Sequence, residues 1–191
     1  VYRNGTDLQS QGRWRDSNLV RWFDNTLRPI GGWRTRSDTA SAGQVRGLHS
    51  WIANNSDRWI AAGSYNKLYA YSGAGARYDI TPTGLTAGNE DALQPVGYGN
   101  AFYGLEYYGI ARQEVTTIVP ATTWAMDSWG EYLVACSSKD GKVYQWQLNT
   151  GTIAAPVANA PVNNRSILVT EERFLMCLGA GGNPRLVQWS D

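Results

Sequence analysis

The sequence has few of the residues from which catalytic and metal-binding sites are usually built. Its 191 residues include one histidine, His49, and two cysteines, Cys136 and Cys177. Charged residues make up 17% of the chain, below the roughly 25% usual in soluble domains. Two cysteines are too few for a disulfide scaffold, and each lies in an apolar run. We therefore expect both to be small buried side chains of a protein assembled in a reducing cytoplasm.

The motifs of the common enzyme and metal sites are missing as well. No cysteine or histidine pair has zinc-ligand spacing, and neither an acidic calcium loop nor a phosphate-binding glycine loop occurs. Ser50 follows His49, but nucleophilic catalysis also needs an orienting carboxylate and an oxyanion hole. The acidic pairs at 90–91 and 171–172 fall in expected loops, where nothing sets two carboxyls across a cleft for glycoside hydrolysis. We expect no enzyme activity, no metal and no cofactor.

Long hydrophobic runs are also absent. The apolar stretches extend over only a handful of residues, too few to cross a membrane, and the N-terminus lacks the apolar core of a signal peptide. We therefore expect no membrane insertion. The chain starts at Val1 without Met and stops in strand-like sequence at 189–191, so we expect it to be a piece of a longer polypeptide.

Tryptophan and tyrosine are abundant. The chain has nine Trp and eleven Tyr against three Phe, together with 21 Gly. Trp and Tyr each combine a large apolar body with a polar tip, which suits surfaces that are partly buried and partly hydrated, and both are enriched at protein interfaces. This composition favours a protein that buries surface against neighbours, and the glycines indicate many turns.

Three segments share one pattern, in which an aromatic residue leads an apolar run, a polar turn follows, and a basic residue opens a run that ends in an aromatic. The turns contain Gly, Asn or Asp-Gly, which favour hairpins, and the second runs alternate with the period of a strand. A further strand is expected before each hairpin, led by Trp51 and Trp124 in the first two repeats. We expect little or no long helix and strands near 51–53, 59–63, 67–71, 132–136, 142–148, 166–170, 174–178 and 185–189.

The spacing of the repeats indicates the fold. The leading aromatics Tyr132 and Phe174 are 42 residues apart, whereas Trp59 and Tyr132 are 73 apart, and an insertion at 82–117 accounts for the difference. A period of about 40 to 45 residues with short antiparallel strands is typical of a β-propeller blade. We predict an all-β fold of propeller-like blades over 45–191, with an extended N-terminal interface segment over 1–44. An ordinary β-sandwich remains open, and three blades would be only part of a propeller, which usually has four to eight.

The insertion has a composition of its own. Between 97 and 109, glycines alternate with aromatics and no strand or helix period holds. A disordered linker is the alternative, but linkers are rarely so aromatic. We expect a protruding loop that contacts another subunit or a different protein through its five aromatic residues, Tyr98, Phe102, Tyr103, Tyr107 and Tyr108.

The N-terminal region is rich in arginine. Eight arginines and four aspartates lie within the first 46 residues, a local charge of +4 in a chain whose net charge is +1. These arginines could attract a DNA backbone or form bidentate pairs with acids of a neighbouring subunit. The interleaved aspartates favour the subunit interface, with Arg13, Arg15 and Arg21 as candidates. Residues 18–33 are expected to form two short strands about a turn, with Pro29 restricting the second to an edge or a bulge.

Several short motifs, taken in order, resemble a family of bacteriophage proteins. These are the nozzle or hub proteins of short-tailed phages, also described as packaged-DNA stabilisation proteins. The resemblance covers about 80 residues, and it is the order of the motifs that carries it. The motifs are Asn18–Phe23, Leu27–Trp33, Val45–Trp51, Ala61–Ser64, Lys67–Tyr69 and Tyr78–Pro82.

The resemblance implies a structural virion component located in the tail. Members contain a β-propeller, and six copies form a ring below the portal and adaptor. The ring continues the channel through which packaged DNA passes without sequence-specific binding, and it helps to retain and eject the genome. The alternatives are a receptor- or carbohydrate-binding propeller and, less directly, a propeller glycosidase.

Overall fold

The computed structural model describes residues 6–9, 11–12, 17–37, 39–93 and 118–191, and the chain divides into two compact units, Val1–Arg36 and Ser37–Asp191. The regular structure is all-β, as the sequence predicts. Within the described residues the only helical element is the three-residue 3-10 turn η1, Ala180–Gly182.

The smaller unit contains one hairpin. Strands β1 (Val20–Phe23) and β2 (Thr26–Pro29) pair antiparallel around Asp24 and Asn25. Both turn residues have positive φ, 46° and 57°, as a two-residue turn of this kind requires. The predicted pair of short strands is confirmed, and Pro29 ends the second strand of a two-stranded sheet, where its missing N–H costs no ladder bond.

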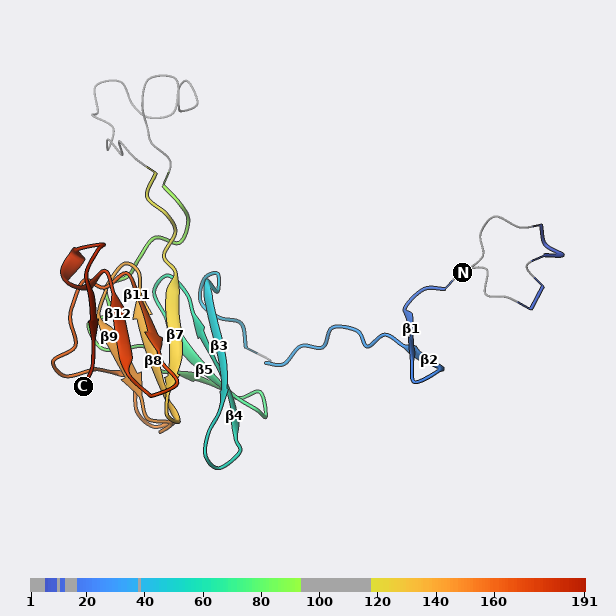
Figure 1. Ribbon diagram of the computed structural model, residues 1–191, viewed down its shortest axis with the longest axis horizontal. Helices are drawn as coiled ribbons and strands as arrows, with labels where there is room; N and C mark the ends of the chain where they lie inside the picture. The colour runs from blue at the N-terminus through green and yellow to red at the C-terminus, as the bar shows by residue number, and fades with distance from the viewer. Residues whose placement is uncertain (1–5, 10, 13–16, 38, 94–117) are drawn as a thin grey trace, which may run out of the picture. The chain divides into compact units, whose positions relative to one another are not determined.

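The larger unit holds three antiparallel sheets in chain order (Figure 1). Sheet I comprises β3 (Gly47–Ile52), β4 (Arg58–Gly63), β5 (Leu68–Ser72) and β6 (Arg77–Asp79). Sheet II comprises β7 (Trp124–Trp129), β8 (Tyr132–Ser137), β9 (Val143–Trp146) and β10 (Ala155–Pro156). Sheet III comprises β11 (Ser166–Val169), β12 (Leu175–Leu178) and β13 (Val187–Trp189).

Within each sheet, every strand pairs with the next along the chain. The prediction of at least three antiparallel strands per repeat is therefore confirmed. Two short strands, β6 and β10, were not predicted, because three and two residues are too few to show a period. The strand predicted at 185–189 begins only at Val187, because the chain first makes the turn η1 and a further bend.

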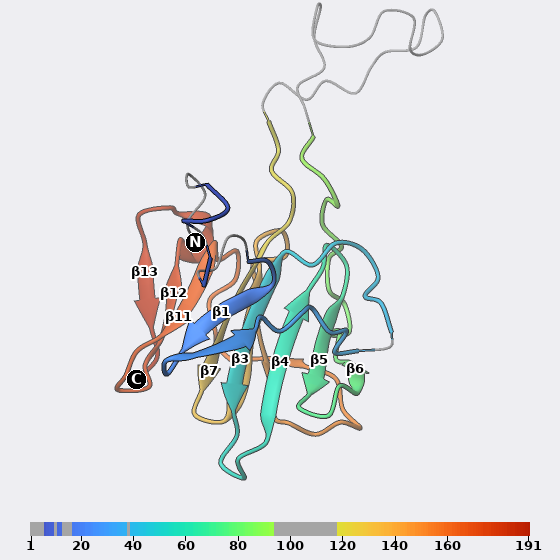
Figure 2. The ribbon, with the colours of Figure 1, turned by 90° about the vertical axis from the view of Figure 1, so that its right-hand side faces the viewer.

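The three sheets stack on one another, with sheet II in the middle. Strand β7 lies beside β3 on one side and β11 on the other, so the first strands of the three sheets are neighbours (Figure 2). Alternate residues of sheet II enter two separate clusters of buried side chains, one shared with sheet I and one shared with sheet III. Sheet II is thus buried on both faces.

The described ends of the insertion form a stem between β6 and β7. Leu93 and Val119 form an antiparallel bridge, and the Asn89 amide donates to Thr122 Oγ1 at 2.8 Å. Gly88 lies so close to Thr122 that a Cβ there would be 1.8 Å from its hydroxyl oxygen. The two arms leave the sheets side by side (Figures 1 and 2). The segment 97–109, where the interaction loop is predicted, lies outside the described residues.

Candidate functional site

Each sheet has two faces that differ in what they contact. We call the face toward the next sheet along the chain the forward face and the opposite one the backward face. Residues that lie opposite each other in paired strands share a face. The strand registers therefore show which side chains lie on the forward face and which on the backward face. The forward face of sheet I meets the backward face of sheet II, and the forward face of sheet II meets the backward face of sheet III.

The contact between sheets I and II is dominated by aromatic side chains. The indole of Trp59 meets Trp146 edge-on, with ring centroids 5.2 Å apart and planes at 76°. Trp124 lies on Gly63, and its Nε1 donates to the carbonyl of Ser64 at 2.6 Å. The other strand side chains buried in this contact are Trp51, Ala61, Leu68, Ala70, Leu133, Ala135 and Tyr144, and Ala53, Ile80 and Ala154 join them from the connecting segments.

The contact between sheets II and III is built from smaller side chains. It buries Val134, Cys136 and Val143 from sheet II against Ile167, Leu175 and Cys177 from sheet III. Burial raises the pKa of Cys136 to about 12 and also raises that of Cys177. Both thiols are therefore protonated at neutral pH, as expected for small buried side chains with no reactive role.

One hydrogen bond recurs at both contacts. Trp51 of sheet I donates from Nε1 to the carbonyl of Glu131, in the first turn of sheet II, at 3.0 Å. Trp129 of sheet II donates in the same way to the carbonyl of Arg173, in the first turn of sheet III, at 2.8 Å. The two contacts are therefore repeats of one interface, with a tryptophan on the forward face and a turn carbonyl on the next sheet.

The backward face of sheet I has no neighbouring sheet within the larger unit. Leu48 and Ile52 of β3 are 69% and 62% exposed on this face. At one end, residues 40–46 cover it: the Ala42 amide donates to the Tyr69 hydroxyl at 3.2 Å, and Tyr69 is buried. The rest of the face mixes apolar and polar side chains: Ile60, Tyr71 and Arg77 are half-buried, and Ser50, Arg58 and Asp79 are exposed.

The forward face of sheet III is also open. Leu168, Val187 and Trp189 are 37%, 40% and 64% exposed on it, and Met176 and Leu178 between them are half-buried. Exposed apolar side chains thus lie at both ends of the stack of three sheets. Exposed apolar patches of this kind mark interaction sites.

The sequence contains an indication of these surfaces that a search for alternating apolar and polar residues does not detect. Strand β12 reads Leu-Met-Cys-Leu and β4 contains Trp-Ile-Ala-Ala, apolar on both faces. Such strands are expected where a sheet is covered on both sides. The strands that form these two faces contain none of the predicted interface candidates.

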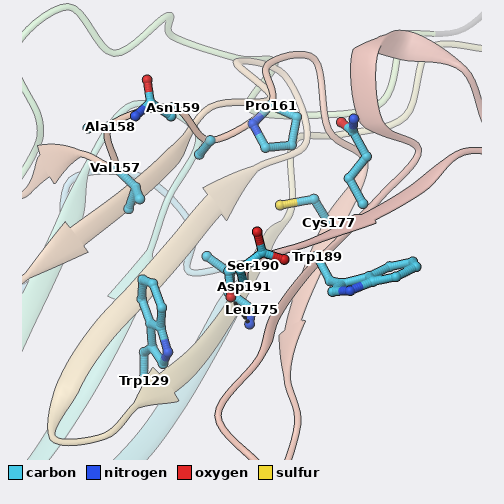
Figure 3. A pocket seen from close by; sticks show the side chains of 12 residues that line it. Trp129, Val157, Ala158, Asn159, Pro161, Leu175, Cys177, Trp189, Ser190 and Asp191 are labelled. Atoms are coloured by element: carbon cyan, nitrogen blue, oxygen red, sulfur yellow. Dashed lines mark hydrogen bonds between the residues drawn. The ribbon is translucent and has the colours of Figure 1, made fainter.

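A cavity of about 320 Å³ lies between sheets II and III (Figure 3). Its cause is the register of β13. In sheet II, the positions opposite Ala135 and Leu133 hold Tyr144 and Trp146, whose rings fill the contact with sheet I. In sheet III the corresponding places beside Cys177 and Leu175 hold Gln188 and Ser190. These side chains leave the space open.

Trp189 is the aromatic that the repeat pattern matches to Trp146, but the register places it opposite Met176, on the forward face. Its ring is directed away from Trp129 (Figure 3). The match that the sequence indicates between Trp189 and Trp146 is therefore off by one residue, because the loop that ends at Leu186 carries the chain one position further before pairing begins.

His49 and Ser128 meet where the first strands of sheets I and II are neighbours, and Asp127 precedes Ser128 on the opposite face of β7. His49 Nε2 is 2.8 Å from Ser128 Oγ. The Asp127 carboxylate instead accepts the backbone amides of Ser128 and Val169, each at 2.8 Å. Burial lowers the pKa of His49, and the charge of Asp127 opposes this only in part. A catalytic triad needs the carboxylate on the imidazole, whereas here it ties β7 to β11.

The predicted interface residues are only partly described. Arg13, Arg15 and the five aromatics Tyr98, Phe102, Tyr103, Tyr107 and Tyr108 lie outside the described residues. Arg21 is on β1 and exposed, with its guanidinium carbon 5.8 Å from the centroid of the Phe23 ring. Arg28 approaches the same ring at 5.1 Å. The described hairpin therefore presents two arginines around one phenylalanine.

Among the described residues, no group of three or more His, Cys, Asp or Glu side chains is arranged to hold a metal ion. No helix in that part of the chain is long and apolar enough to cross a membrane. Comparison with known proteins finds no family model that matches the chain and no significant similarity to a curated protein or a solved structure.

Proposed function

We propose that the chain is a structural subunit of a short-tailed bacteriophage tail, part of the nozzle or hub, and that its three sheets are blades of a β-propeller. The observation that carries the propeller part is the stacking of sheet II. It is covered on both faces by sheets of the same strand order, and the first strands of all three sheets are neighbours. Blades around a common axis have this arrangement.

A structural role rather than a catalytic one is supported by how the polar groups are used. Ser128 bonds to the lone histidine, but Asp127 is occupied by two backbone amides. The hydrogen bonds from Trp51 and Trp129 serve to fasten one sheet to the next. Together with the low charge content and the open apolar faces, these features suit a subunit that buries surface in an assembly.

The tail assignment rests on the resemblance of the motif series. Under this assignment, the chain belongs to an oligomeric ring in the virion tail, through which DNA passes without sequence-specific contacts. In this proposal Arg13, Arg15 and Arg21 contact acids of a neighbouring subunit. Replacing all three with Gln should abolish ring assembly, whereas intact rings that leak genome would assign the arginines to DNA instead.

Immuno-electron microscopy tests the tail assignment directly. Gold-labelled antibody raised against the purified chain should bind to the tail, at one vertex, on particles of the phage that encodes the chain. Antibody depleted on the purified chain is the control. Particles that carry no label would contradict the proposal. So would purified virions in which mass spectrometry does not detect the chain.

A carbohydrate- or receptor-binding module is the second candidate. The observation that favours it is the exposure of tryptophan: Trp33 is fully exposed and Trp189 largely so. Exposed indoles offer flat apolar surfaces on which sugar rings stack. Binding to a glycan array, lost in Trp33→Ala or Trp189→Ala, would support this candidate over the tail assignment.

A further inference from the structure

A polar pocket of about 260 Å³ lies between sheets II and III, and it shares no lining residue with the cavity of Figure 3. Sheet II contributes 138–141, the turn between β8 and β9. Sheet III contributes 163–165, the segment that leads into β11, together with Gly182 of η1. The lining residues all fall within 138–182, so the walls of the pocket do not depend on where the sequence begins or ends.

The two segments are fixed against each other. The backbone amide of Asn164 and its side-chain Nδ2 each donate to the carbonyl of Gly141 at 2.9 Å. A Cβ at Gly141 would lie 2.6 Å from the Cα of Asn163, so the two backbones are in direct contact. Gly141 and Asn164 are both buried. The pocket is therefore preformed, as binding sites for small groups usually are.

Two basic side chains line the pocket, one from each sheet. Lys139 belongs to the turn of sheet II and Arg165 to the segment that leads into sheet III, and both are exposed. The stem of Arg165 lies against Gly179, where a Cβ would be 2.9 Å from Arg165 Cγ. Within the part of the chain that the structure describes, neither the ammonium nor the guanidinium group has a hydrogen-bond or salt-bridge partner. The pocket thus carries two unpaired positive charges.

Among the described residues, Asp140 is the only acid that lines the pocket, and its charge is already engaged. Its side chain is 2% exposed, its carboxylate accepts a hydrogen bond from the Tyr144 hydroxyl, and the Lys142 ammonium lies 3.6 Å from its Oδ1. With the two unpaired cations, three basic residues and one acid give a local charge of +2. The unit Ser37–Asp191 as a whole has ten basic and thirteen acidic residues, a net charge of −3. This pocket is therefore a local positive site on a unit of opposite charge.

An equivalent arginine in sheet I shows what a residue in this place can bind. Arg46 and Arg165 each precede the first strand of their sheet, and the amide of each donates to the carbonyl of the last residue of the second strand, Gly63 or Leu178. The guanidinium of Arg46 binds the Asp91 carboxylate at 2.8 Å. Arg165 occupies the same place in sheet III, but no described carboxylate reaches it.

We propose that this pocket binds an acidic segment of a partner protein, with one carboxylate held between Lys139 and Arg165. The planar guanidinium suits a bidentate contact with a carboxylate, and the lysine adds a second charge-assisted bond. Asn164 Oδ1 is buried beside the pocket and has no hydrogen-bond partner among the described residues. A peptide brings a backbone N–H as well as the carboxylate, and a free carboxylate ion lacks that donor.

A nucleic acid fits the pocket less well. Binding to a phosphate backbone relies on several cations along the strand, whereas the pocket offers two on a unit whose net charge is −3. The inference goes beyond the proposed function and does not rest on it.

Titration of the ¹⁵N-labelled chain with an acidic peptide, followed through amide chemical shifts, tests the proposal. The probe is acetyl-Gly-Glu-Gly-Glu-Gly-amide, and the control peptide has Gln in place of both Glu. We expect saturable shifts at 138–141 and 163–165, including the side-chain amide of Asn164. The dissociation constant of the control peptide should be about tenfold higher or more, because the two peptides differ in charge and hardly in shape. The positions of the shifts separate the pocket from the arginine-rich N-terminal region, which also attracts acids.

Two variants remove the charges one at a time. Arg165→Gln and Lys139→Gln should each raise the dissociation constant measured at the pocket about fivefold or more. Arg58→Gln is the matched control, because Arg58 is exposed in sheet I and does not line the pocket, and it should leave that constant unchanged. All three side chains are exposed, and far-UV circular dichroism checks that the variants fold.

Shifts confined to residues outside the pocket, equal affinities for the two peptides, or equal losses in Arg165→Gln and Arg58→Gln would overturn the proposal. Displacement of the peptide by an equimolar amount of inorganic phosphate would show that the pocket takes free anions instead. Tighter binding of a thymidine oligonucleotide of the same charge would assign the pocket to nucleic acid. None of these outcomes affects the immunolabelling test of the tail assignment.

Discussion

The contact between sheets I and II depends on a glycine, and a single added methyl group should disrupt it. A Cβ at Gly63 would lie 2.3 Å from Cδ1 and 2.4 Å from Cγ of Trp124. Carbon atoms pack at about 3.5 Å or more, so the indole would have to withdraw by about 1.2 Å. It has little room, because Gly47 lies against its Cβ and a 2.6 Å hydrogen bond holds its Nε1 on Ser64.

Two costs combine in Gly63→Ala. Overpacking a filled contact costs about 1–3 kcal/mol, and breaking the hydrogen bond of a buried indole adds about 1 kcal/mol. We expect the free energy of unfolding to fall by about 2–4 kcal/mol. Urea titration followed by tryptophan fluorescence and by far-UV circular dichroism measures this loss.

Two further variants test the reasoning behind that value. Gly151→Ala is the control, because the only atom near its added Cβ is Asn149 Oδ1 at an ordinary 3.4 Å, and it should change stability by less than about 0.5 kcal/mol. In the background Trp124→Leu, where the ring is gone, Gly63→Ala should cost much less than in the unaltered chain. An unchanged urea midpoint for Gly63→Ala, or equal costs in both backgrounds, would refute the argument.

Three other predictions follow from burial and pKa. Trp146→Ala should lower the free energy of unfolding by about 3–5 kcal/mol, because this indole is buried between sheets I and II, whereas Trp189→Ala, measured by the same titration, should leave it nearly unchanged, because Trp189 is largely exposed. Because burial lowers the pKa of His49, the unfolded state binds the extra proton first, so stability should fall as pH drops below about 6.5. His49→Gln should reduce that pH dependence between pH 7.5 and 5.5, and an identical slope in both proteins would contradict it. Cys136 and Cys177 should not react with a thiol reagent such as DTNB in the native protein at pH 8 and should both react in urea, since their thiols are buried and their pKa values raised; rapid native labelling would show that the contact between sheets II and III opens.

The sequence by itself determined the class of fold and most of its local structure. Strand periods, turn residues and the spacing of Trp59, Tyr132 and Phe174 were enough to predict an all-β chain with repeated antiparallel hairpins. These signals are local, because side-chain alternation and turn chemistry depend on neighbours a few residues apart. Strands β6 and β10 were not predicted, because three and two residues are too few to show a period.

Only the tertiary structure decided which face of each strand meets another sheet. His49 and Ser128 are 79 positions apart in the chain, and their contact exists because β3 and β7 are neighbours. Trp146 and Trp189 end matching repeats, yet one is buried and the other exposed, because pairing fixes the register and a shift of one residue reverses the face. The open faces, the cavity and the packing of Trp124 against Gly63 all follow from such long-range pairing, which no local pattern encodes.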